Sequence, residues 1–154
     1  MSGVRIVQGS DTSNDQETVL ANSAVIDFQD PVYLDASGFL NQITTSSRVE
    51  GFYEEQRKTV TSDNQTVALA KGQWDGNLYD VVVEMTADQA ATQADVGLYF
   101  NVAIASNVIT ANLPCNATTG QFQLIDFDPD RDGTTTKVRA KVAFPEQLAF
   151  KINS

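Results

Sequence analysis

The sequence contains no histidine and a single cysteine, and these two absences exclude several kinds of chemistry. Without histidine the chain cannot form Ser-His-Asp or Cys-His catalytic pairs, a His-ligated metal site or a proton shuttle near neutral pH. Cys115 has no second cysteine with which to form a disulfide or a cysteine-rich metal site. This cysteine usage is typical of a protein assembled in a reducing cytosol.

Basic residues and long apolar runs are also scarce. The chain has 10 Lys and Arg against 20 Asp and Glu, a net charge of −10, which repels nucleic acids and anionic lipid surfaces. No window approaches the roughly 18 apolar residues of a membrane-spanning helix, and residues 1–10 lack the apolar region of a secretory signal. We therefore expect a soluble protein without nucleic-acid or membrane partners.

Short runs of β-branched and aromatic residues recur between turn residues, whereas helix signals are rare. This pattern predicts an all-β, single-domain antiparallel β-sandwich or β-barrel with one short helix and extended terminal arms. We divide the chain into an N-terminal strand and polar arm (1–23), a β-rich core (24–144) and a C-terminal arm (145–154). The expected strands are Gly3–Gln8, Pro31–Asp35, Phe39–Ile43, Arg48–Glu54, Thr59–Thr61, Gln65–Ala70, Leu78–Met85, Leu98–Ala105, Val108–Asn112, Gln121–Phe127 and Lys137–Phe144.

Turn residues predict how several of these strands connect. The segment 36–38, with Gly38 at its end, predicts a hairpin with a bulge, and 62–64 predicts a second hairpin. Ser106 and Asn107 predict a tight turn. The one expected helix is Thr86–Ala94, because Thr86 and Gln89 have the spacing of a capping box.

The basic residues are unevenly distributed. No Lys or Arg occurs from 73 to 130, where there are eight acidic residues, whereas Lys137, Arg139 and Lys141 occupy alternate positions of one expected strand and so share one face. Two interpretations are open. The stripe is a solvated face, or it meets an acidic surface on a neighbouring subunit.

One acidic segment resembles a ligand site. Asp128, Asp130, Asp132 and Gly133 match positions 1, 3, 5 and 6 of an Asp-rich calcium loop. The twelfth position, which supplies a bidentate Glu in an EF-hand, is Arg139, so an EF-hand is excluded. Asp128, Asp130 and Asp132 remain candidate Ca²⁺ ligands, although we favour a solvated turn between two strands.

Other candidate residues favour packing over chemistry. Trp74 lies between glycines, and two interpretations are open. It stacks on a sugar or a partner, or it packs within the protein, which we favour. The adjacent aromatics 52–53 and 99–100 point to opposite faces of their strands, so both faces must be covered. Cys115 has no nearby cation to lower its pKa and should be inert. No pair of the 20 acids is marked out for glycoside hydrolysis, so we expect no enzyme.

Two stretches resemble a known family. Asp30–Ile43 (DPVYLDASGFLNQI) and Ser47–Tyr53 (SRVEGFY) are similar to the turn-rich segment of tailed-bacteriophage capsid cement, or head decoration, proteins. Val96–Phe100 (VGLYF) and Gly120–Ile125 (GQFQLI) continue the likeness.

The resemblance implies a non-enzymatic virion protein that binds the outer capsid surface as a trimer, cements neighbouring major capsid protein subunits and stabilises the DNA-filled head. Such a protein is made in the host cytoplasm and needs no cofactor. The terminal segments would clasp the shell through the apolar residues Val4, Ile6, Leu148 and Phe150. The alternative is a carbohydrate- or receptor-binding β-module of a fibre or head appendage.

Overall fold

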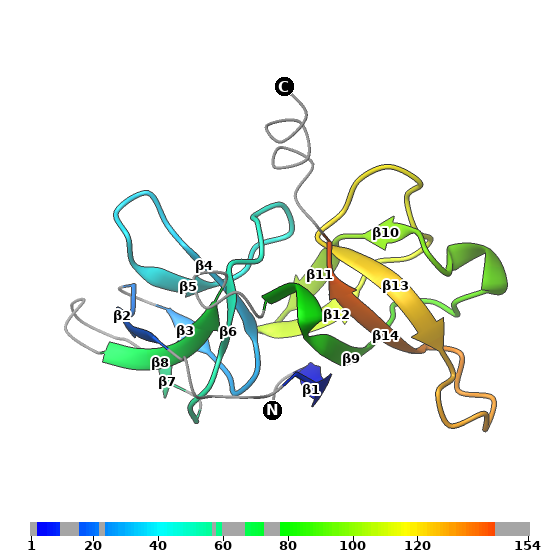
Figure 1. Cartoon of the computed structure of the whole chain (residues 1–154), viewed down its shortest axis with the longest axis horizontal. Coiled ribbons are helices and arrows are strands. Elements are labelled where there is room, and N and C mark those ends of the chain that lie inside the picture. Colours follow the sequence, from blue (N-terminus) through cyan, green and yellow to red (C-terminus); the bar gives the residue numbers. More distant parts are fainter. Residues whose placement is uncertain are drawn as a thin grey trace.

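The protein folds into antiparallel β-sheets that do not close into a barrel (Figure 1). This computed structural model describes residues 3–9, 16–21, 24–56, 58–59, 67–72 and 78–143. Over these residues the only helical elements are 3₁₀ turns, and none is long or apolar enough to span a membrane. The prediction of an antiparallel all-β fold is confirmed, and the barrel alternative is wrong.

The main sheet joins the first strand to four strands from the second half of the chain. Its order is β1 (Val4–Gln8), β9 (Val82–Thr86), β14 (Lys137–Val142), β13 (Phe122–Phe127) and β10 (Tyr99–Phe100). Alternation is strict along β14, where Val138, Ala140 and Val142 are buried and the residues between them are partly exposed. One face of this sheet therefore builds the core and the other faces outward.

A two-stranded sheet of β11 (Val102–Ala105) and β12 (Val108–Ala111) packs beside β9. The two strands are joined by Ser106 and Asn107, whose φ angles are 51° and 65°. Positive φ at both central residues is the type I′ geometry that matches the twist of a hairpin, so the predicted tight turn is confirmed.

The second five-stranded sheet holds the residues of the first half. Its order is β2 (Gln16–Val19), β8 (Val67–Gly72), β6 (Gly51–Tyr53), β4 (Pro31–Leu34) and β5 (Leu40–Gln42). Strands β3 (Val25–Ile26) and β7 (Lys58–Thr59) form a separate pair. The predicted hairpin around 36–38 is confirmed, because β4 and β5 are antiparallel neighbours and Gly38 has φ 85°.

Two hydrophobic cores meet at β6. The larger core lies behind the main sheet and includes Phe100, Phe122 and Leu124, while the smaller one includes Leu20, Ile26 and Leu40. Consecutive residues of β6 supply both, since Phe52 packs in the larger core and Tyr53 in the smaller, each fully buried. The prediction that both faces of this strand are covered is confirmed.

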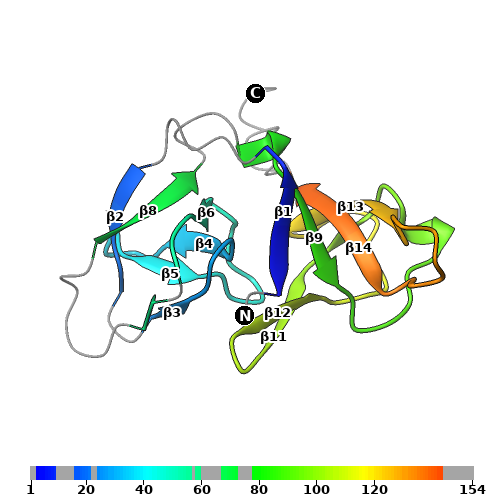
Figure 2. The same ribbon diagram turned by 90° about the horizontal axis from the view of Figure 1, so that it is seen from below.

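Three glutamine side chains tie the two halves together. Gln121 Nε2 donates to the carbonyl oxygens of Thr44 and Ser47 at 2.8 and 2.5 Å, while its Oε1 accepts from Val102 N–H. Gln42 Nε2 donates to Asn107 O at 2.8 Å, and Gln29 Oε1 accepts the Ile6 N–H of β1 at 2.9 Å. Strand β1 consequently contacts both halves, and Figure 2 shows it between the two sets of strands.

The predicted helix Thr86–Ala94 is wrong. Thr86 ends β9, and the backbone N–H groups of Ala87 and Ala91 donate to Thr136 O and Thr135 O, so they are used by a neighbouring segment instead of a helix. The capping interaction forms further on, where the Asp95 carboxylate accepts the Thr92 N–H ahead of the 3₁₀ turn Gln93–Asp95. Alanine content favours a helix only when no tertiary partner competes for the backbone.

The predicted hairpin between 59–61 and 65–70 is also wrong for the residues described. Thr59 pairs with Val25 in β3, while β8 already has β2 on one side and β6 on the other. The turn 62–64 lies outside the described residues. The expected polar arm 9–18 is described only in part, and Gln16–Thr18 within it belong to β2.

Replacing Gly3 with Ala should detach β1. A Cβ at this position would collide with the backbone carbonyl oxygen of Ile109 and lie 2.9 Å from its nitrogen. We expect a loss of about 1–3 kcal/mol in the free energy of unfolding, the usual cost of overpacking, with faster amide hydrogen exchange along β1. The control is Gly38→Ala, where nothing lies within 4 Å of the added Cβ and the cost comes from the φ of 85° in the β4–β5 turn. It should leave amide exchange in β1 unchanged, and equally faster exchange of β1 in both variants would contradict the steric argument.

Candidate functional site

A row of charges crosses the outward face of the main sheet. Arg5 on β1 is paired in register with Glu84 on β9, and Glu84 is paired with Arg139 on β14. Directly paired residues of antiparallel strands project from the same face, so three side chains from distant parts of the chain lie side by side.

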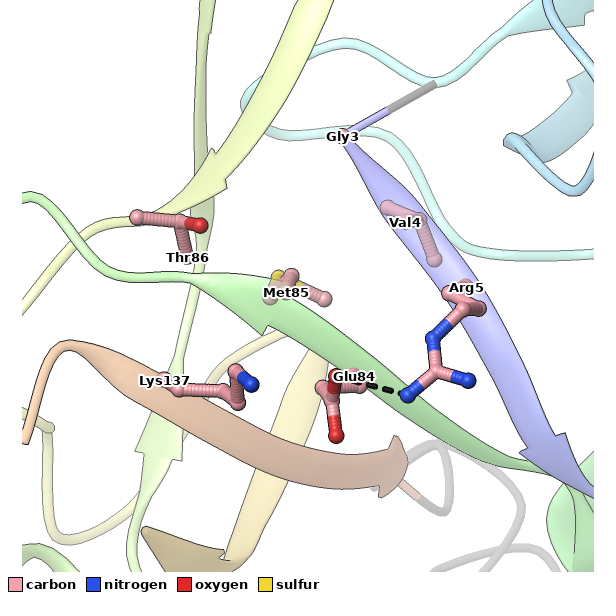
Figure 3. Close-up of a pocket in the computed structure, with 7 residues that line it drawn as sticks. All are labelled: Gly3, Val4, Arg5, Glu84, Met85, Thr86 and Lys137. Carbon is pink, nitrogen blue, oxygen red and sulfur yellow. Dashed lines mark hydrogen bonds and ion pairs between the residues drawn. The ribbon is translucent and has the colours of Figure 1, made fainter. Parts of the chain in front are cut away.

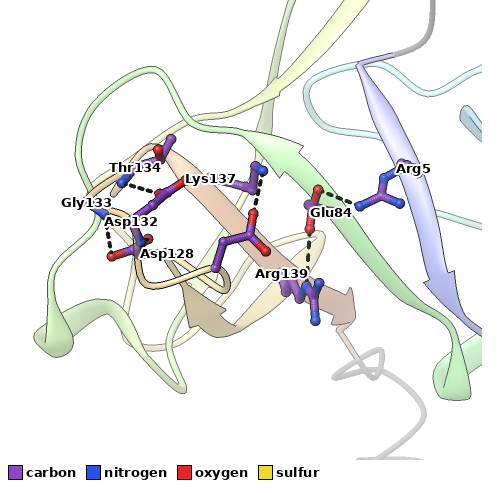
Figure 4. Close-up of polar contacts among 9 residues, drawn as sticks. Arg5, Glu84, Asp128, Asp132, Gly133, Thr134, Lys137 and Arg139 are labelled. Atoms are coloured by element: carbon purple, nitrogen blue, oxygen red, sulfur yellow. Dashed lines mark hydrogen bonds and ion pairs between the residues drawn. The ribbon is translucent and has the colours of Figure 1, made fainter.

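Glu84 holds both arginines. Arg5 Nη2 donates to its Oε1 at 2.9 Å and Arg139 Nε to its Oε2 at 3.2 Å (Figure 4). Burial of this carboxyl acts to raise its pKa, but the hydrogen bonds from Arg5 and Arg139 and the positive charges of Arg5 and Lys137 outweigh burial, so its pKa lies below the ordinary value. Glu84 is therefore ionised at neutral pH and fixes both guanidinium groups.

The basic stripe predicted on β14 lies on this same face. Lys137, Arg139 and Lys141 are partly exposed and alternate with buried residues. Lys137 Nζ pairs with Asp130 Oδ2 at 3.0 Å. We call the face that carries Arg5, Lys137, Arg139 and Lys141 the basic face. Its bases are partly neutralised within the chain, and whether the remaining charge meets solvent or a partner stays open.

A shallow depression of about 150 Å³ lies at the end of the basic face where β1 begins (Figure 3). Its polar groups are Arg5, Glu84, Thr86 and Lys137. The remaining lining residues are Gly3, Val4 and Met85. Two bases and a hydroxyl, against the single carboxylate of Glu84, leave a net positive lining that suits a carboxylate or a similar small anion.

Arg5 and Glu84 were not predicted as site residues from the sequence. Their pairing depends on a register between residues 79 positions apart. The available signal was Glu84 itself, because a charged residue within the apolar run 81–85 must find a partner when that run forms a strand in a sheet.

The acidic loop uses its carboxylates on itself. Asp128 accepts the backbone N–H groups of Asp132 and Gly133 at 3.0 and 3.2 Å, and Asp132 accepts that of Thr134 at 3.0 Å (Figure 4). Asp130 points to Lys137. Among the residues the structure describes, no group of three or more His, Cys, Asp or Glu side chains is arranged to hold a metal ion. The geometry favours the interpretation of a self-capped turn, in which Asp128 has a φ of 48°.

Two of the residues predicted to anchor a partner, Val4 and Ile6, lie in the core. Val4 and Ile6 are 3% and 8% exposed and pack in the larger core of their own chain, because β1 is a strand of the main sheet. They are thus engaged within the chain and not presented to a shell. Leu148, Phe150 and Trp74 lie outside the described residues.

Cys115 is placed where a thiolate is disfavoured. Burial and the charge of Asp95 raise its pKa to about 12. Asp95 is itself 7% exposed, and its carboxylate accepts the backbone N–H groups of Cys115 and Thr92 at 3.0 and 2.9 Å. This pair joins the 3₁₀ turn to the loop after β12, so the chemistry here is structural.

Comparison with protein-family models, with curated proteins and with solved structures finds no match to this chain.

Replacing Glu84 with Gln should destabilise the protein in a pH-dependent way. A Glu whose pKa is depressed by folding contributes stability that is complete above the unfolded value of about 4.3 and is lost as the pH falls through the folded value. The loss should be about 1–2 kcal/mol near neutral pH, because the arginine partners remain partly exposed. It should shrink below about pH 4, as urea unfolding across that range would show. Asp80→Asn removes an exposed carboxylate and serves as the control. A pH-independent cost would contradict the assigned role of Glu84.

Replacing Asp128 with Asn should be tolerated. Asn retains one acceptor oxygen for the turn and accepts positive φ, whereas Asp128→Ala loses both features. We expect Asp128→Asn to melt close to the original protein and Asp128→Ala to melt lower. Neither EDTA nor Ca²⁺ should shift the melting temperature of the unsubstituted protein. A drop with EDTA that calcium reverses, absent in Asp130→Ala, would instead establish a metal site.

Proposed function

We propose that this protein is a non-enzymatic structural component of a bacteriophage virion. It binds the outer surface of the icosahedral capsid, cements neighbouring major capsid protein subunits and stabilises the DNA-filled head. Its partners are the major capsid protein and further copies of itself, arranged as a trimer, after synthesis in the host cytoplasm.

The observation that carries this proposal is where the family-like segments lie in the fold. Asp30–Ile43 and Ser47–Tyr53 supply β4, β5 and β6, in which β4 pairs with both of the others. Val96–Phe100 and Gly120–Ile125 supply β10 and the first part of β13, which also pair with each other. Segments that resemble the family in sequence are therefore neighbours in space, as a shared architecture requires.

The inventory of side chains also supports a binding role. The chain has no histidine, and its only cysteine is held as a thiol at neutral pH. The buried carboxylates Asp30, Glu84 and Asp95 all accept hydrogen bonds from side chains or backbone N–H groups. Free energy of association is then available from surface contacts, and specific protein interfaces bury about 1,200–2,000 Å² in total.

Capsid binding tests the proposal directly. Purified protein, mixed with DNA-filled heads that lack it, should co-sediment at a fixed ratio to the major capsid protein, and decorated heads should release DNA at a higher temperature than bare heads. Absence of co-sedimentation, or equal release temperatures, would remove the cement function.

The position of β1 determines which truncation accompanies this test. Deleting residues 1–8 removes an edge strand of the main sheet, so that variant would report on folding. Deleting residues 147–154 leaves every described strand intact. If the C-terminal arm clasps the shell, this deletion should lower occupancy without lowering the melting temperature.

A further inference from the structure

The basic face stands out in an acidic protein. Four of the chain's 10 basic residues lie on it, on β1 and β14, although the net charge is −10. The acids on the same face are Glu84 and Asp126, which are paired in register with the arginines, and Asp130, which is paired with Lys137. Four bases against three acids leave a small excess of positive charge on one side of one sheet.

The bases on this face are held in place but remain accessible. Glu84, with a side chain only 10% exposed, fixes Arg5 and Arg139, yet the Arg5 side chain is 64% exposed. Lys137 is paired with Asp130, whose side chain is 59% exposed, and an exposed pair of this kind contributes about 0–1 kcal/mol and is readily exchanged. Pre-positioned bases lose little conformational entropy when they bind an anion.

The spacing of the bases matches an extended chain. Lys137, Arg139 and Lys141 follow one another at alternate positions of β14, which places their Cα atoms about 7 Å apart along the strand. An extended peptide with acidic residues at alternate positions has the same repeat. The depression beside Arg5 and Lys137 adds a recess of about 150 Å³ at one end of this row.

We propose that the basic face binds an extended acidic segment of a partner protein, with one carboxylate seated between Arg5 and Lys137 and others along β14. This inference concerns the isolated protein and holds whether or not the chain decorates a capsid.

Charge complementarity favours a protein segment over the other occupants. A nucleic acid is charged along its whole length and would meet the acidic remainder of the molecule. A peptide with alternating acids contacts only the basic face. A second copy would have to present acids in this same spacing on an extended segment. The described segment with acids at alternate positions, Asp126–Asp132, is folded into a turn in which Asp128 and Asp132 accept backbone N–H groups, so it does not offer an extended row.

Fluorescence polarisation with two labelled heptapeptides tests the proposal. In one peptide three glutamates alternate with serines, and in the other the same three glutamates are contiguous. We expect tighter binding of the alternating peptide at low salt. Lys137→Gln and Lys141→Gln should each weaken it about two- to fivefold, the effect of one exposed charge pair. Asp130→Asn, which frees Lys137, should strengthen binding of the alternating peptide. Arg131→Gln removes one positive charge from the exposed loop, as each lysine substitution does from the basic face, and should leave binding unaltered.

Three results would overturn the proposal. The first is equal affinity for the two peptides, or affinity that Lys137→Gln and Lys141→Gln do not change. The second is tighter binding of a single-stranded oligonucleotide that these variants abolish, which would assign the face to nucleic acid. The third is self-association in sedimentation experiments that the variants abolish while no peptide binds, which would assign the face to a second copy.

Discussion

The arrangement of the molecule depends on the burial of two adjacent aromatic side chains of β6. Phe52 and Tyr53 point to opposite faces of a three-residue strand, and each is fully buried in a different core. A fully buried aromatic contributes several kcal/mol, as Phe→Ala losses of about 3–5 kcal/mol indicate. Because neither ring can be exposed without that loss, the two halves of the chain are held against the same short strand.

Burial of apolar side chains does not by itself fix one orientation of the two halves. The hydrogen bonds of the glutamine side chains fix that orientation. Gln121 is 9% exposed, and its Nε2 donates across the boundary to Thr44 O and Ser47 O, while its Oε1 accepts from Val102 N–H in its own half. Sliding one half past the other would leave the buried amide nitrogen without these acceptors, at a cost of about 1–3 kcal/mol for an unpaired group. Neutral amides achieve this at any pH, which suits a chain with no histidine.

Local features were predictable from sequence, and long-range ones were not. Both confirmed turns depend on residues that adopt positive φ, Gly38 and Asn107, and turn chemistry is set within a few residues. The helix failed because Ala87 and Ala91 donate to a segment more than 40 residues away. The acidic loop could be recognised as a motif because Asp128, Asp130 and Asp132 lie within five residues of one another. The row of charges around Glu84 can be recognised only once the strand register is known. Val4 and Ile6 were predicted to anchor a partner because they are apolar and near a terminus. They lie in the core because they are apolar.

The placement of β1 also sets an order of folding. Strand β1 leaves the ribosome well before its partner β9, which begins at Val82, so the pair closes a loop of more than 70 residues. At synthesis rates of roughly 5–20 residues per second, β1 has no partner strand for several seconds. The β11–β12 hairpin, by contrast, closes on a two-residue turn and can form within microseconds. The main sheet cannot be completed until β14 is made, because β14 joins β9 to β13, and non-local closure of this kind leaves an unpaired edge on β9 in the nascent chain.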